Sequence, residues 1–158
     1  MQRAPVFWDL EELLAQIGAW RCDGRTLGLV SGTFDLLHVG HMRFLERASC
    51  LTDALIVGVD SDAKVSVRKG AARPVLPDRE RMEMLSHVRH VDAVFLKTIA
   101  PRWHFATSIQ PDVLIVSSET YGEEDLDLLR QEVKAIALLP RDSGMSTSQP
   151  SRLMAWRK

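Results

Sequence analysis

The feature of this sequence that most constrains its fold is a series of short apolar runs that alternate with segments of helical periodicity. The runs are rich in Val, Ile and Leu and lack an alternation of apolar and polar residues, which is typical of strands covered on both faces. Such strands belong to parallel sheets with helices on either side. We therefore expect strands at 26–31, 54–59, 93–96, 113–116 and 135–139.

The segments between these runs predict helices. A capping box of Asp9 and Glu12 precedes apolar residues at helical spacing, so a leading helix is expected up to Gly24. The stretch 61–77 shows no such pattern and is predicted to be an irregular segment, the longest in the chain, of a kind that is often functional. Further helices are expected through 42–51 and at 79–90, 101–109 and 126–133.

Together these elements predict the α/β class. We expect a single Rossmann-like domain with a doubly wound, parallel, five-stranded sheet and helices on both faces. Residues 1–24 would form the leading helix and residues 25–158 the α/β core, without a linker between them. Sheets of this kind bind ligands beyond the carboxyl ends of their strands, where the winding reverses. Functional residues are therefore expected in the turns that lead from strands into helices.

Charge and composition exclude several classes of protein. The net charge of -1 gives no basic field for nucleic acid, and no apolar run approaches the roughly 20 residues that span a bilayer. With only Cys22 and Cys50, the chain has neither a disulfide framework nor a cysteine-rich zinc site, which fits a reducing compartment. We expect a cytoplasmic protein without a nucleic-acid or membrane partner, in which the recognition of anions is local.

The most informative motif is the string Gly32 to His41, GTFDLLHVGH, between the first expected strand and the helix that follows it. Glycine at the strand end lets the backbone approach a phosphate, and the helix N-terminus offers free N–H groups and a partial positive charge. His38 and His41 flank Gly40, so both imidazoles can reach one ligand. A zinc site would need a third ligand, and the cysteines do not support one. The string predicts a phosphate site with no metal bound by the protein.

This string resembles the signature of the cytidylyltransferase-like nucleotidyltransferases, whose His-X-Gly-His motif contacts the triphosphate and supports in-line displacement at the α-phosphorus. Residues 69–81 are similar to the lysine, Arg-Pro and Glu-Arg elements of that superfamily, and residues 141–148 to its Arg-X-X-Gly-Ile-Ser-Thr-Thr motif. The resemblance covers most of the chain. It implies transfer of NMP from ATP or CTP to a phosphorylated small molecule, with release of pyrophosphate, and a homodimer. The chemistry also calls for Mg²⁺ held by substrate oxygens and water.

The resemblance assigns roles to residues along the chain. The catalytic residues would be His38, His41, Lys69 and Arg141. The residues expected at the nucleotide are Gly32, Thr33, Phe34, His38, Gly40, His41, Arg73, Glu80, Arg81, Met145, Ser146 and Thr147. Those expected at the acceptor are Asp35, Lys69, Ser117 and Ser118. The basic side chains would neutralise phosphate charge, and the glycines would allow close backbone contacts.

The residues leave several alternatives open for the substrate. The leading helix and the spacing from Lys69 to Arg73 look most like heptose-1-phosphate adenylyltransferases, whereas Thr33 is closer to glycerol-3-phosphate cytidylyltransferases. The segment 117–119 departs from the acceptor motifs of both. A last helix is expected after the cluster Ser146–Ser148, and Pro150 lies just inside it. A heptose-type adenylyltransferase is the leading hypothesis, ahead of a cytidylyltransferase for glycerol phosphate or a phosphorylated amino alcohol. A non-catalytic nucleotide-binding module and a relative of class I aminoacyl-tRNA synthetases come after these.

Overall fold

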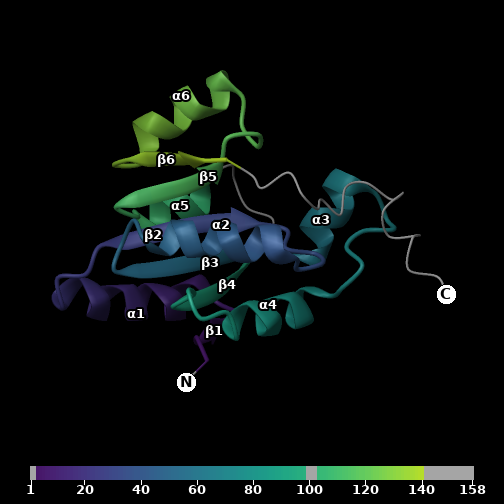
Figure 1. Cartoon of the computed structure of the whole chain (residues 1–158), viewed down its shortest axis with the longest axis horizontal. Coiled ribbons are helices and arrows are strands. Elements are labelled where there is room, and N and C mark those ends of the chain that lie inside the picture. Colours follow the sequence, from purple (N-terminus) through teal and green to yellow (C-terminus); the bar gives the residue numbers. More distant parts are fainter. Residues whose placement is uncertain (1–2, 99–102, 141–158) are drawn as a thin grey trace.

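One parallel sheet organises the molecule (Figure 1). The computed structural model describes residues 3–98 and 103–140, and within them six strands hydrogen-bond in the order β1-β4-β3-β2-β5-β6. Every pairing between neighbouring strands is parallel. The strands are β1 Val6–Phe7, β2 Leu27–Gly32, β3 Ala54–Asp60, β4 Ala93–Lys97, β5 Val113–Ser117 and β6 Ile136–Leu139. The predicted α/β class with a parallel, doubly wound sheet is confirmed.

The sheet has one strand more than predicted. The additional strand, β1, lies at the edge and pairs through Val6 and Phe7 with Val94 and Phe95 of β4. A strand of two residues carries no measurable periodicity, so a search for apolar runs cannot find it. Pairing with β4 makes this segment a strand at the edge of the sheet. The predicted number of strands is therefore corrected from five to six.

The helices cover both faces of the sheet. They are α1 Leu10–Cys22, α2 Val39–Ser49, α3 Asp62–Lys69, α4 Asp78–Ser86, α5 His104–Ile109 and α6 Glu123–Glu132. Side chains of a strand point alternately to its two faces. Leu29 and Ile56 accordingly pack with α1, α5 and α6, whereas Val30 and Val57 pack with α2 and α4. The predicted leading helix is confirmed as α1, which Asp9 caps by accepting a hydrogen bond from the N–H of Glu11 at 2.7 Å.

The segment 61–77, predicted to be irregular, contains a helix. Ser61 caps α3 by accepting from the N–H of Lys64 at 3.3 Å, and Val65 is the only side chain of α3 that is buried. Because one buried apolar residue makes no apolar stripe, hydrophobic periodicity does not reveal this helix. The basic residues of the segment are therefore presented partly from a helix, α3, and partly from the loop after it.

The helix predicted at 79–90 is shorter in the structure. It is α4, which ends at Ser86, and the N–H groups of Val88 and Val91 bond to carbonyl groups three residues before them in turns. The spacing of Leu85, Val88 and Val91 imitates a helix, although these residues lead the chain back to the sheet. The other predicted helices and strands agree with the structure to within three residues at each end.

The path of the chain fixes where a ligand can bind. From β2 the chain moves outward through β3 to β4, and then it crosses back to β5 and β6 on the other side. The winding therefore reverses between β2 and β5, and the carboxyl ends of these strands border a crevice.

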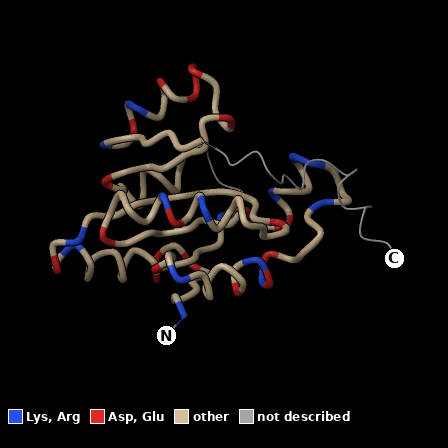
Figure 2. The backbone as a smooth tube through the Cα atoms, viewed as in Figure 1, with Lys and Arg blue, Asp and Glu red and all other residues tan. Residues whose placement is uncertain are grey.

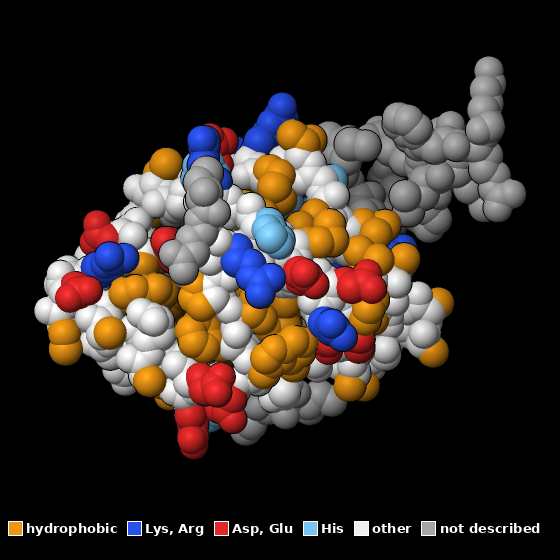
Figure 3. Space-filling model, turned by 90° about the horizontal axis from the view of Figure 1, so that it is seen from below, with side chains coloured by type: hydrophobic (Ala, Val, Ile, Leu, Met, Phe, Trp, Pro, Cys, Tyr) orange, Lys and Arg blue, Asp and Glu red, His pale blue; other side chains and the backbone are white. Residues whose placement is uncertain are grey.

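On the face of the molecule that is seen from below, hydrophobic side chains lie among charged ones (Figure 3). Within the described residues, no helix is long and apolar enough to cross a membrane.

Candidate active site

A cavity of about 840 Å³ lies at the carboxyl ends of four neighbouring strands. The last residue of each strand lines it: Gly32 of β2, Asp60 of β3, Lys97 of β4 and Ser117 of β5. The turn after β2, parts of α3 and α5, and residues 119–121 after β5 also contribute to the wall. A concave site of this size, where the winding reverses, suits a small molecule. The position agrees with the sequence-based expectation, although that analysis did not single out Asp60 or Lys97.

The turn between β2 and α2 brings the two motif histidines together. Their ring centroids are 3.9 Å apart, and both side chains line the cavity. His38 is the N-cap of α2, and its Nδ1 accepts a hydrogen bond from the N–H of Gly40 at 3.1 Å. This contact fixes the ring at a helix N-terminus, where the backbone favours an anion. The predicted arrangement of two imidazoles beside a helix N-terminus is present in the structure.

The same turn depends on glycine for a reason that the sequence did not reveal. A Cβ atom on Gly32 would lie 3.1 Å from the ring of Phe34. Phe34 is nearly buried and has a φ of 49°, in the left-handed region that residues other than glycine rarely adopt. Its ring centroid is 5.4 Å from that of His41. Gly32 therefore allows Phe34 to fold back beneath the motif histidine.

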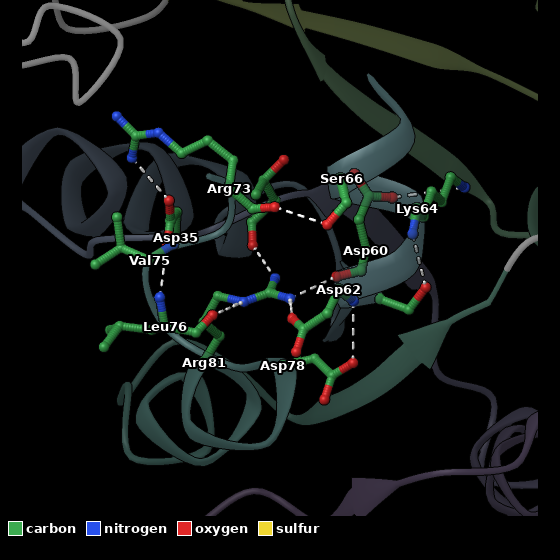
Figure 4. Close-up of polar contacts among 12 residues, drawn as sticks. Asp35, Asp60, Asp62, Lys64, Ser66, Arg73, Val75, Leu76, Asp78 and Arg81 are labelled. Atoms are coloured by element: carbon green, nitrogen blue, oxygen red, sulfur yellow. Dashed lines mark hydrogen bonds and ion pairs between the residues drawn. The ribbon is translucent and has the colours of Figure 1, made fainter. Parts of the chain in front are cut away.

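Asp35, an expected acceptor ligand, holds the loop after α3. Its Oδ2 accepts from Arg73 at 3.0 Å, and its Oδ1 accepts from the N–H groups of Val75 and Leu76 at 2.8 and 3.0 Å (Figure 4). Asp35 is 6% exposed, although it also lines the cavity. Arg73, an expected nucleotide ligand, does not line the cavity wall. In this structure Asp35 and Arg73 position the loop.

Arg81 joins three segments beneath the cavity. It is fully buried, and its Nε donates to the carbonyl of Leu76 at 2.9 Å. The guanidinium also donates to the backbone carbonyls of Thr33 and Asp60 and, at 2.7 Å, to the carboxylate of Asp62 (Figure 4). All three nitrogen atoms thus have protein acceptors. Arg81 lies outside the cavity lining and positions these segments in this structure, while its expected contact with the nucleotide stays a prediction.

Glu80 and Ser118 were expected to contact substrates, and both lie away from the cavity wall. Glu80 is exposed in the first turn of α4. Ser118 is exposed, and its N–H donates to the carbonyl of Leu139 at 3.0 Å. Neither side chain lines the cavity, and their assignment as nucleotide and acceptor ligands stays a prediction.

Helix α3 supplies a basic wall. Lys64, Arg68 and Lys69 line the cavity, and basic segments are visible on α3 in Figure 2. Arg68 donates to the hydroxyl of Thr33 at 2.6 Å and to Asp60 Oδ2 at 3.0 Å. Burial, with the nearby charge of Arg68, lowers the pKa of Lys69 from its ordinary value. The predicted catalytic lysine is therefore at the site, partly desolvated and among other cations.

The ends of β3 and β4 add an ion pair that the sequence analysis missed. Asp60 and Lys97 are directly opposite each other in the β3–β4 register, and Lys97 Nζ lies 3.1 Å from Asp60 Oδ1. Lys97 also donates to the hydroxyl of Ser31. The available signal was a charged residue directly after each of two predicted strands, 54–59 and 93–96. Parallel strands end at the same edge of a sheet, so such residues can meet.

Burial disfavours the charged forms of both Asp60 and Lys97. Desolvation lowers the pKa of Lys97 to about 8, against the opposing attraction of Asp60. Burial also disfavours the charged form of Asp60, but the cations Lys97, Arg68 and Lys64 outweigh it and hold the pKa of Asp60 below its ordinary value. The carboxylate is therefore ionised near neutral pH, and the lysine begins to lose its proton at moderately alkaline pH.

At the end of β5, Ser117 lines the cavity as expected for an acceptor ligand. Its Oγ is buried and has no hydrogen-bond partner among the described residues. A buried hydroxyl without a partner is costly, so a polar group of a ligand is a natural partner for it. The predicted catalytic Arg141 and the nucleotide ligands Met145, Ser146 and Thr147 lie outside the described residues.

The chain is similar to a known family and to several known proteins. The model of the cytidylyltransferase-like family matches residues 29–149. The bifunctional protein HldE of Methylobacillus flagellatus is 36% identical over 151 residues, which cover 93% of this chain and 30% of the relative. HldE of Wolinella succinogenes is 38% identical over 131 residues, 82% of this chain and 27% of the relative. The chain thus spans less than a third of the length of these relatives.

A solved structure shares the fold. It is the crystal structure of the lipopolysaccharide core biosynthesis protein from Thermoplasma volcanium, which has a TM-score of 0.63 at 24% identity. The similarity covers 75% of this chain and 98% of that protein. At this level of identity, the likeness concerns the arrangement of the sheet and its helices.

Proposed function

Because this chain belongs to the cytidylyltransferase-like family, we propose that it transfers NMP from a nucleoside triphosphate to a phosphorylated small molecule. The observation that carries the proposal is the pair of imidazoles, 3.9 Å apart, at the N-terminus of α2 within the cavity. We further propose that the nucleotide is ATP and the acceptor a sugar 1-phosphate of the heptose type. The spacing from Lys69 to Arg73 and the HldE relatives support this choice.

The proposed reaction needs no covalent intermediate on the protein. An oxygen of the acceptor phosphate forms a bond to the α-phosphorus of the triphosphate, the bond from that phosphorus to the bridging oxygen breaks, and pyrophosphate leaves with the electron pair. Catalysis then consists of positioning the reactants and stabilising the charge on the phosphoryl oxygens. Mg²⁺ would be held by triphosphate oxygens and water, and it would neutralise phosphate charge.

The residues of the cavity can divide this work. His38 and His41 would donate hydrogen bonds to the transferring and leaving phosphates at the N-terminus of α2. Lys69 would add positive charge from α3. Fixed donors stabilise charge more effectively than water because they do not have to reorient during the reaction. Arg81 donates to the backbone carbonyls of Thr33 and Asp60, and it would hold the turn after β2 and the end of β3 in place.

Pyrophosphate release tests the proposal. The protein is incubated with ATP or CTP, Mg²⁺ and a panel of sugar, polyol and amino-alcohol phosphates. We expect release with ATP and a sugar 1-phosphate. Release only with CTP and glycerol phosphate or an amino-alcohol phosphate would establish the cytidylyltransferase alternative. If no pair reacts although a nucleotide raises the melting temperature, the chain is a binding module, and the proposed activity is wrong.

A further inference from the structure

Lys97 occupies an unusual position for a lysine. It is 7% exposed at the end of β4, and its ammonium group lies 4.0 Å from the centroid of the Phe105 ring on α5. On the strand side it contacts Asp60, which is 1% exposed, and Ser31. Lysine is almost never buried to this extent without a partner. Lys97 is thus clamped between an aromatic ring and a carboxylate at the wall of the cavity.

Stability alone does not account for this arrangement. Removing two charges from water costs several kcal/mol for each ion in general, and apolar residues of similar size often fill such a position as well or better. A buried ion pair in a cleft is therefore a candidate for a functional role. At Gly58, a Cβ atom would lie 2.8 Å from Lys97 Cδ and from two ring atoms of Phe95. The backbone of β3 leaves space for the lysine stem.

The charges around Asp60 do not balance. Its Oδ1 lies 3.1 Å from Lys97 Nζ and 3.5 Å from Lys64 Nζ, and its Oδ2 lies 3.0 Å from Arg68. One carboxylate thus faces three cations, and all three cations line the cavity. Two positive charges are left in excess at this wall. A phosphate monoester carries between one and two negative charges near neutral pH, so it matches this excess.

The shared carboxylate also allows an exchange of partners. If the ammonium group of Lys97 turns to a ligand, Asp60 keeps its contacts with Lys64 and Arg68. The carboxylate is then not left buried without a counter-ion, which is the costly outcome when an ion pair is broken. The energetic barrier to recruiting Lys97 is therefore lower than it would be in an isolated pair.

We propose that Lys97 binds the phosphate of the acceptor and exchanges its contact with Asp60 for a phosphoryl oxygen. This inference rests on the proposed nucleotidyl transfer and specifies its acceptor site. The acceptor phosphate then lies at the ends of β3 and β4, while the triphosphate lies at the N-terminus of α2. Lys97 makes a phosphorylated acceptor preferable to a neutral one, because a neutral alcohol cannot compensate the excess charge at this wall.

The role of Lys97 can be tested by steady-state kinetics with the acceptor that the panel identifies. Lys97→Met keeps the stem and removes the charge, and we expect the KM for the acceptor to rise about 10- to 100-fold. The KM for ATP should stay within about 3-fold. Lys97→Arg should recover most of the acceptor affinity because a guanidinium also binds phosphate. Lys134→Met is the matched control: Lys134 pairs with Asp112 at 2.7 Å outside the cavity, and its removal should change neither KM.

The pH dependence of the acceptor KM gives a second readout. A purely structural role of Lys97 would not produce it. Because burial lowers the pKa of Lys97 to about 8, the acceptor KM of the unaltered protein should rise above that pH. In Lys97→Arg the rise should disappear, because arginine keeps its charge. The charged groups facing Lys97 are Asp60 of β3 and Lys64 and Arg68 of α3, and His104 of α5 also lines the cavity. The rise should persist in a His104→Ala variant.

Two outcomes separate this inference from the proposed function. If transfer occurs but Lys97→Met changes the KM for ATP instead of that for the acceptor, or changes neither, the role of Lys97 is wrong and the activity stands. If no acceptor reacts, titration calorimetry with inorganic phosphate still tests the site. Binding at least about 10-fold weaker in Lys97→Met than in the unaltered protein supports it. Equal binding in folded Lys97→Met and Lys97→Arg variants overturns it.

Discussion

Two regions of the cavity wall are built in different ways. Within the turn from Gly32 to His41, the histidines and Phe34 contact residues of the turn itself: His38 contacts Gly40 and His41, and Phe34 packs against Gly32. The cluster around Asp60 and Lys97 is assembled from separate strands, and Lys97 donates to Ser31, 66 positions away. The first region uses imidazoles and backbone groups, whereas the second uses buried full charges. One cavity thus combines a wall whose contacts are local in the sequence with a wall that strand register creates.

Arg81 connects the two regions, so its loss should have the largest effect on stability. Its guanidinium donates to the carbonyls of Thr33 and Asp60 and to the carboxylate of Asp62. Arg81→Met would leave these acceptors without their donor, and we expect the free energy of unfolding in urea to fall by about 3 to 5 kcal/mol. Arg130→Met, which removes an exposed pair with Asp127, should cost less than about 1 kcal/mol. Equal losses in the two variants would show that Arg81 does not join the walls.

The histidines test the locally encoded region. We expect His38→Ala and His41→Ala each to lower kcat about 100- to 1,000-fold, or about 3 to 4 kcal/mol in the barrier, because each removes a fixed donor to the developing charge. Stability should change by about 1 kcal/mol or less. The exposed His87, outside this cavity, provides the control His87→Ala with normal turnover. Folded motif variants that keep kcat within about 3-fold would contradict the catalytic role.

Gly58 tests the region made by strand register. In Gly58→Ala the new methyl group would lie 2.8 Å from Lys97 Cδ and from the ring of Phe95. Such overpacking should lower the free energy of unfolding by about 1 to 3 kcal/mol. At Gly18 in α1 nothing lies within 4 Å of a new Cβ, so Gly18→Ala should be neutral or stabilising by up to about 1 kcal/mol. If thermal unfolding shows the same shift for both variants, the close packing of Lys97 and Phe95 against Gly58 does not contribute to stability.

The smallest expected effect is the pH dependence of stability that Lys97 confers. Its pKa is about 8 in the folded protein and 10.5 when it is solvated. Between these values the unfolded chain binds more protons than the folded one, so the contribution of Lys97 to stability rises with pH across this window. The unfolding free energy of the unaltered protein, relative to that of Lys97→Met, should therefore rise by on the order of 1 kcal/mol from pH 8 to pH 10. A constant difference in urea titrations would mean that Lys97 is not desolvated.

The two regions also differ in how far the sequence predicted them. Gly32, Gly40 and both motif histidines could be placed at one site because residues in a strand-to-helix turn are neighbours in any parallel α/β fold. Arg81 was expected to contact nucleotide because Glu80 and Arg81 resemble the Glu-Arg element of the nucleotidyltransferases. The structure buries it. Its acceptors belong to segments whose positions the sequence does not state.

The sequence by itself determined the α/β class, the parallel sheet and the turn that carries His38 and His41, because these follow from local periodicity and from contacts within a few residues. The tertiary structure decided which strands are neighbours, and with that the pairing of Asp60 with Lys97 in the β3–β4 register. It also decided that Asp35 and Arg81 support the walls. Burial and long-range pairing are properties of the packed sheet, and a residue's charge becomes informative only when its surroundings are known.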